Sequence, residues 1–247
     1  MMKETEVIIK NNGTKLYGVL HTPSRQTKSV IIFANGYPDN LVEGHLIISS
    51  ARYFCKNGYA FLRVNPRGRP PSSGKLTHVG LFDMINDLEN IVDFLKKNCY
   101  DKIGLIGHSL GGLSAILMNS ESLNAISLWE PSSVKVLNNF LAKTGMATQF
   151  KKHRYAVDEE SGFVVGRKLF DDLKKITNIS QDFKKINSPI LIIAGSKLLT
   201  PTAKLYFKYA NEPKSLKIIK NARHTFDNQK HEDMLFKYTY DWFHKWI

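Results

Sequence analysis

The chain has 247 residues, 43% of them hydrophobic, which fits one large globular domain and excludes a disordered or disulfide-stapled protein. Its net charge of +13 comes from 35 Lys and Arg against 22 Asp and Glu, but the lysines are scattered, which disfavours a nucleic-acid partner. The apolar runs are far too short to span a membrane and no signal-peptide segment follows the first residues, so we expect a cytoplasmic protein.

Short apolar runs alternate with longer helical patterns, as in a mostly parallel sheet with helices on both faces. The first two strands, Glu6–Lys10 and Lys15–His21, flank Asn11-Asn12-Gly13, which is a hairpin signal. The later strands are dense in Ile, Leu and Val, as expected for strands buried on both faces. Those six are predicted over Ser29–Ala34, Ala60–Val64, Ile103–Ile106, Ala125–Trp129, Pro189–Ala194 and Ser215–Ile219.

Helices are predicted between these strands, where apolar residues recur at helical spacing. They cover Leu46–Asn57, Phe82–Lys97, Gly111–Asn119, Ala203–Tyr209 and His231–Trp246. Residues 131–187 break the alternation and are predicted to form two or three helices without a strand. We interpret them as a lid inserted into a single domain that spans residues 1–247. Its candidate pocket or packing residues are Phe140, Leu141, Met146 and Phe150.

The strongest chemical signal is Gly107-His108-Ser109-Leu110-Gly111-Gly112, which fits the pattern G-x-S-x-G between a buried strand and a helix. Such a turn holds the serine in a strained backbone conformation and exposes its hydroxyl above the sheet. A Cβ at Gly107 or Gly111 would collide across the turn. The pattern therefore predicts Ser109 as a nucleophile.

With these residues the chain resembles the α/β-hydrolase superfamily, and within it small-lidded esterases such as cinnamoyl esterases and the serine aminopeptidase-like group. The resemblance covers nearly the whole chain and is weakest over residues 131–187. It implies the α/β-hydrolase fold, with a mostly parallel eight-stranded sheet, helices on both faces and a small helical lid. It implies no cofactor and no metal.

Relatives carry a His-Gly-aromatic step where this chain has Asn35-Gly36-Tyr37, and the residue after the glycine donates its backbone N–H to the oxyanion. The resemblance thus implies the N–H groups of Tyr37 and Leu110 as the oxyanion hole. Asn35 replaces the usual histidine and leaves the backbone donor in place. We expect Arg67, in an Arg-Gly step of a neighbouring loop, to tie loops together without a chemical role.

Of the 8 histidines, His224 follows the last strand and precedes the final helix, where relatives carry the catalytic base. A base on this loop sits above the carboxyl edge of the sheet, within reach of the serine. His108, inside the serine turn, is expected to have its side chain fixed away from this group.

The acid of the triad is absent from its usual place. Relatives carry Asp in the loop after the strand that corresponds to Pro189–Ala194, whereas Gly195-Ser196-Lys197-Leu198-Leu199-Thr200-Pro201 has no carboxylate. Our first candidate is Glu130, which ends a strand and keeps the order nucleophile, acid, base along the chain. The alternatives left open are Asp227 and, as neutral acceptors, Ser196 and Thr200.

These residues predict a serine hydrolase that cleaves carboxylic esters with short acyl or aryl groups through a Ser109 acyl-enzyme. Its expected partner is a small-molecule ester. A thioesterase or acyl-peptide hydrolase would use the same residues. The missing Asp keeps open a third interpretation, a degenerate ligand-binding protein that retains the fold without turnover. The oligomeric state stays undetermined.

Overall fold

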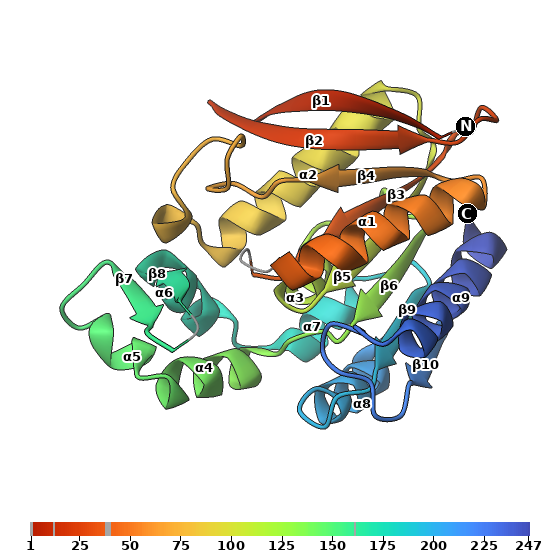
Figure 1. The fold of residues 1–247 in the computed structure, drawn as a ribbon. Helices are drawn as coiled ribbons and strands as arrows, with labels where there is room; N and C mark the ends of the chain where they lie inside the picture. The colour runs from red at the N-terminus through yellow and green to blue at the C-terminus, as the bar shows by residue number, and fades with distance from the viewer. Residues whose placement is uncertain (1, 12, 38–40, 161) are drawn as a thin grey trace.

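A twisted sheet of eight strands runs through the computed structural model, which describes residues 2–11, 13–37, 41–160 and 162–247 (Figure 1). In spatial order the strands are β1 (Lys3–Asn11), β2 (Thr14–Thr22), β4 (Ala60–Val64), β3 (Ser29–Ala34), β5 (Lys102–His108), β6 (Ala125–Trp129), β9 (Ile190–Ala194) and β10 (Lys214–Ile218). Strand β2 is antiparallel to β1 and β4, and the other neighbours are parallel. The predicted sheet of eight mostly parallel strands is confirmed.

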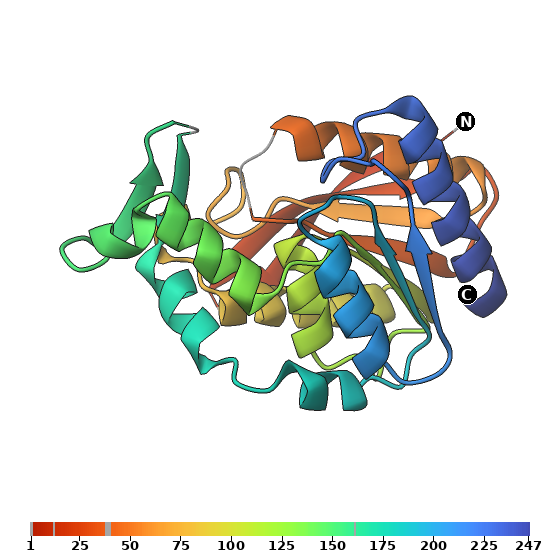
Figure 2. The same ribbon diagram turned by 90° about the horizontal axis from the view of Figure 1, so that it is seen from below.

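Helices cover both faces of this sheet (Figures 1 and 2). One face carries α1 (Leu41–Lys56) and α9 (Gln229–Trp246), and the other carries α2 (Leu81–Lys97), α3 (Leu110–Leu117) and α8 (Thr200–Tyr209). In β3, Ile31 and Phe33 pack toward α1 and α9, whereas Val30 and Ile32 pack toward the opposite layer. Burial on both faces explains the continuous apolar runs. No helix in the described parts of the chain is long and apolar enough to cross a membrane.

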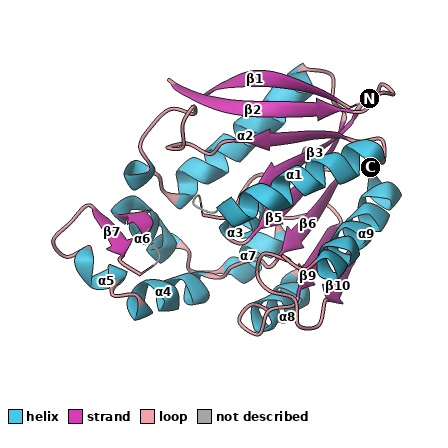
Figure 3. Ribbon diagram, in the orientation of Figure 1, coloured by secondary structure: helices cyan, strands magenta, loops and turns pink. Residues whose placement is uncertain are grey.

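The segment 131–187 contains a hairpin that the sequence did not reveal (Figure 3). Its elements are α4 (Val134–Lys143), α5 (Met146–Gln149), β7 (Tyr155–Asp158), β8 (Phe163–Gly166), α6 (Arg167–Lys175) and α7 (Ile179–Lys184). The prediction of two or three helices without a strand was therefore wrong, since β7 and β8 pair antiparallel. Each strand has only four residues, too few for an alternating pattern to be distinguished from a helical one.

This segment lies beyond the arrowheads of β3, β5 and β6, and it is anchored to the start of α2 (Figure 1). The Lys168 ammonium lies 2.6 Å from the Asp83 carboxylate of α2. The buried Asp172 carboxylate accepts a hydrogen bond of 3.4 Å from the N–H of Phe82, in the first turn of α2, where the helix dipole favours an anion. Arg67 binds Asp87 of α2 at 2.6 Å, so it ties its loop to a helix rather than to another loop as expected.

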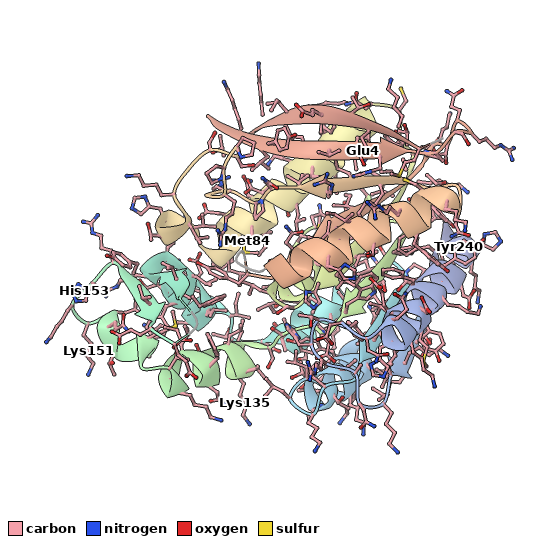
Figure 4. The ribbon with its side chains drawn as sticks, in the orientation of Figure 1. Glu4, Met84, Lys135, Lys151, His153 and Tyr240 are labelled. Atoms are coloured by element: carbon pink, nitrogen blue, oxygen red, sulfur yellow. The ribbon has the colours of Figure 1, made fainter. Side chains whose placement is uncertain are left out.

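The two faces of the segment differ in chemistry. Lys135, Lys151 and His153 project outward into solvent (Figure 4). Met146 and Phe150 are buried, and Phe150 stacks on Phe170 of the same segment at 5.0 Å between ring centroids. Of the four candidates named from the sequence, these two therefore pack the segment.

We predict that Gly111→Ala destabilises the protein, because its Cβ would lie 2.2 Å from the carbonyl oxygen of Ala34 and 2.3 Å from that of Asn35. Both contacts are backbone atoms that cannot rotate away, so we expect a loss of roughly 3 kcal/mol or more in the free energy of unfolding. Gly44→Ala is the matched control, since a Cβ there meets nothing within 4 Å in α1 and should leave stability unchanged or raise it. Urea denaturation measures both. Equal stabilities of the two variants would contradict the prediction.

Candidate active site

The turn between β5 and α3 holds Ser109 in a left-handed backbone conformation, with φ 54° and ψ −118°. Its N–H donates to the carbonyl of Trp129 at 3.0 Å, and its own carbonyl accepts from Gly112 at 3.1 Å. A Cβ on Gly107 would lie 2.8 Å from the Cα of Gly112, so the predicted collision across the turn is found there. A Cβ on Gly111 would instead collide with the backbone at the end of β3. The turn therefore presents Ser109 at the amino end of α3.

Ser109 opens into a cavity of about 400 Å³. Its lining brings together the predicted base His224 and the two predicted oxyanion donors, Tyr37 and Leu110. Phe140 and Leu141, the remaining candidates named from segment 131–187, also line it. The cavity therefore lies between the carboxyl edge of the sheet and that segment.

The carboxylate of Glu130 lies behind this cavity and is fully buried. Glu130 follows β6 with φ 45°, a second left-handed residue beside Ser109. Its Oε1 accepts the N–H groups of Gly195 at 2.5 Å and Ser196 at 2.9 Å, and its Oε2 accepts the Ser196 hydroxyl. The ring Nδ1 of His224 lies 3.5 Å from Oε2. The structure thus pairs the predicted acid with the predicted base.

The surroundings of Glu130 favour its ionised form. Burial alone would raise the pKa of this carboxyl, but hydrogen bonds from His224 and from the Ser196 hydroxyl and N–H, together with the Gly195 N–H, hold it below its ordinary value. A carboxylate that stays ionised can fix the tautomer of an imidazole and stabilise an imidazolium.

His108 has its side chain fixed outside the cavity, as expected, and there it supports the loop that carries His224. Its Nε2 donates to the carbonyl of His224 at 2.9 Å, and the two rings lie 4.7 Å apart at their centroids. This placement has a physical reason: the last residue of β5 is fully buried next to the loop after β10, so its polar ring needs a partner there.

The other acid candidates lie in different surroundings. Asp227 is 40% exposed and pairs with Arg223 at 3.2 Å. The Thr200 hydroxyl donates to the carbonyl of Ser196 at 2.7 Å, within the start of α8. Ser196 contacts Glu130 rather than taking its place as a neutral acceptor.

One residue at the site escaped the sequence analysis. The hydroxyl of Ser132 lies 3.2 Å from that of Ser109, and Ser132 lines the same cavity. Its position two residues after Glu130 was the available signal, but a lone serine after a strand carries no pattern that distinguishes it from a turn residue.

The strand order of the sheet identifies the fold, together with the serine turn after β5 and the histidine after β10. Comparisons with solved structures give the same answer. The chain has the α/β-hydrolase fold. The family model described as serine aminopeptidase, S33, matches residues 25–128. No curated protein sequence matches the chain. The resemblance stated from the serine motif is confirmed at the level of fold.

Three solved α/β-hydrolase structures illustrate the similarity. Est1E from Butyrivibrio proteoclasticus, with bound ferulic acid, superposes with a TM-score of 0.78 at 19% identity over 96% of this chain and 98% of its own. The esterase domain of a Rhodothermus marinus protein gives 0.75 at 20% identity over 99% of both chains. The Pyrococcus furiosus esterase Pf2001 gives 0.73 at 23% identity over 99% of this chain and 93% of its own.

We predict that Glu130 makes the stability of this α/β-hydrolase depend on pH. Because its folded pKa lies below the unfolded value, its contribution is present above about pH 4.3 and is lost as the pH falls through the folded pKa. The stability difference between wild type and Glu130→Gln should therefore shrink when urea denaturation is repeated from about pH 7 down to about pH 3.

Ser196→Ala provides the matched control, because it keeps the carboxylate but removes one hydrogen bond that lowers its pKa. In this variant the contribution of Glu130 should be smaller, and its loss should be complete at a higher pH than in wild type, because the folded pKa lies closer to the unfolded value. A stability difference between wild type and Glu130→Gln that stays constant over the whole range would show that Glu130 does not titrate in this way.

Proposed function

We propose that this chain is a serine hydrolase of carboxylic esters, in which Ser109 is the nucleophile, His224 the base and Glu130 the acid. The observation that carries the proposal is the buried Glu130 carboxylate 3.5 Å from Nδ1 of a histidine that shares a cavity with Ser109. This carboxylate can orient the ring of His224, a part for which the loop after β9 offers no carboxylate.

In the first half of the reaction, Ser109 Oγ attacks the ester carbonyl carbon while its proton passes to Nε2 of His224. The carbonyl oxygen becomes an oxyanion, for which we assign the backbone N–H groups of Tyr37 and Leu110 as donors. When the bond to the alcohol breaks, His224 returns the proton to the departing oxygen. The acyl group is then covalently held on Ser109.

In the second half, a water molecule attacks the acyl carbon and gives its proton to His224. The bond to Ser109 Oγ breaks, and His224 returns the proton to this oxygen. Glu130 stays ionised throughout, holds the Nδ1–H tautomer and stabilises the imidazolium that forms twice in each cycle.

The cavity favours an ester over the free amino terminus of a peptide. None of the described residues that line it carries a carboxylate. Glu130 lies behind the wall and is already bonded to Gly195, Ser196 and His224. A buried ammonium would therefore lack a counter-charge, which is costly. This chemistry supports esterase over aminopeptidase activity.

The remaining lining supports an apolar acyl or aryl group. Segment 131–187, which we propose acts as a lid, contributes most of this wall, and apart from Ser132 its lining side chains are hydrocarbon. These are Val136, Leu137, Phe140, Leu141, Phe163, Val165, Leu169 and Leu173. Burial of an apolar group here is favourable and sets no specific polar requirement. Thioesters share this acyl part, so the choice between oxygen and sulfur leaving groups is left to experiment.

We predict that wild type hydrolyses p-nitrophenyl esters and that kcat/KM falls between the C4 and C12 acyl chains. An organophosphonate probe should label Ser109, as an intact-mass adduct, and Ser109→Ala should lose both labelling and turnover. Ser114→Ala serves as control, since Ser114 is a buried serine of α3 whose hydroxyl bonds to the carbonyl of Leu110.

Each outcome of this experiment points to one interpretation. The absence of any adduct on wild type would contradict the serine hydrolase. Labelling without turnover of any ester or thioester would favour the degenerate ligand-binding protein. A steady rise of kcat/KM toward C12 would indicate a lipase or a long-acyl thioesterase.

We predict that Glu130→Gln lowers kcat by about 10⁴, by analogy with removal of the acid in serine proteases, because a neutral amide cannot stabilise the imidazolium. Asp227→Asn is the matched control: it makes the same chemical change on a carboxylate that lies three residues after His224 in sequence and is paired with Arg223. Its kcat should stay within about twofold of wild type. Steady-state assays on p-nitrophenyl butyrate measure both. If Glu130→Gln keeps more than about a tenth of the wild-type kcat, Glu130 is not the acid.

A further inference from the structure

A second hydroxyl contacts the proposed nucleophile directly. The Oγ of Ser132 lies 3.2 Å from the Oγ of Ser109, inside hydrogen-bonding distance. We propose that Ser132 is a further catalytic residue, which donates a hydrogen bond to Ser109 Oγ whenever this oxygen gains negative charge. The proposal rests on the proposed function, since it assigns Ser132 a part in the same acyl transfer.

The backbone around Ser132 holds this hydroxyl in place. The N–H of Ser132 donates to the carbonyl of Ser109 at 3.0 Å, so the two residues are joined twice. The carbonyl of Ser132 accepts the hydroxyl of Tyr206 at 3.0 Å. Ser132 is 4% exposed and Tyr206 is 1% exposed, so solvent competes little for these bonds. The hydroxyl is thus fixed beside the nucleophile before substrate arrives.

The direction of the hydrogen bond follows from the number of protons. Ser109 has one hydroxyl proton, and the proposed mechanism requires it to go to His224. Ser109 Oγ can therefore only accept from Ser132, and Ser132 must donate. This arrangement leaves the proton of Ser109 available to the base and fixes the side-chain rotamer of the nucleophile.

The same bond contributes to both halves of the reaction. During acylation, negative charge develops on Ser109 Oγ as its proton moves to His224. During deacylation, Ser109 Oγ is the leaving group and carries negative charge until His224 returns the proton. A donor that is already in place stabilises the charge that develops in the transition state, and no group has to reorient for it to do so. Ser132 itself keeps its proton, so no bond to it forms or breaks.

A purely structural role for the hydroxyl is less well supported, because the neighbouring residue performs it. The Oγ of Ser133 accepts the N–H of Val136 at 3.3 Å and so caps the start of α4. Ser132 holds its own segment through backbone N–H and C=O groups, which Ser132→Ala retains. Loss of its side-chain oxygen therefore removes mainly the contact to Ser109.

Pre-steady-state hydrolysis of p-nitrophenyl butyrate tests the proposal, with the burst rate reporting acylation and the later rate deacylation. In Ser132→Ala both rate constants should fall by about tenfold or more, the effect of losing a hydrogen bond to a charged group. Because both steps fall together, KM should change little, and so should the preference for acyl chain length. A change in pocket shape would instead alter KM and this preference.

Two further variants complete the test. Ser133→Ala loosens the same segment but keeps the Ser132 hydroxyl, so its rate constants should stay within about twofold of wild type. Ser132→Cys keeps the volume but offers only a weak donor, so it should lose activity in both steps as Ser132→Ala does. If Ser132→Ala and Ser132→Cys both keep their rate constants within twofold, the role of Ser132 is refuted. If wild type itself shows neither burst nor turnover, the proposed function fails instead.

Discussion

The site depends on one buried carboxylate. Glu130 directly follows β6, and the hydrogen bonds that it accepts come from the loop after β9 and from the histidine after β10. Burying a charge is costly unless donors surround it, so these loops must close around Glu130 for the fold to be stable. The arrangement that keeps the carboxylate ionised is therefore the same one that places His224 beside the cavity.

Two residues of the site have strained backbone conformations that the surrounding contacts must hold in place. Ser109 and Glu130 both have positive φ, which an L-residue adopts only where its surroundings compensate. At Ser109 the compensation is the close packing of Gly107, Gly111 and Gly112 around the turn. At Glu130 it is the set of donors to the carboxylate, together with the bond from its own N–H to the carbonyl of Ile193 at 2.8 Å.

Much of this arrangement can be predicted from the sequence, because its signals are local. Each central strand is a continuous apolar run, and the serine turn needs glycines at fixed spacing. Glu130 was identified through chain order, since a carboxylate was missing after β9. The hairpin β7–β8 was not predicted because its strands are short, and Ser132 was not because its partner Ser109 is 23 residues away in sequence. Contacts between residues far apart in sequence, such as Ser132 with Ser109 and His108 with His224, depend on how the strands are ordered in the sheet.

The chemical groups and the cavity wall come from different parts of the chain. Ser109, Glu130 and His224 are attached to the ends of sheet strands, whereas most of the apolar wall belongs to the uninterrupted stretch between β6 and β9. That stretch is anchored to α2 through the ion pair of Lys168 with Asp83 and the hydrogen bond of Asp172 with the N–H of Phe82, neither of which involves Glu130. If the proposed function holds, insertions, deletions or exchange by recombination within this stretch can thus reshape what the protein accepts while Ser109, Glu130 and His224 are inherited unchanged.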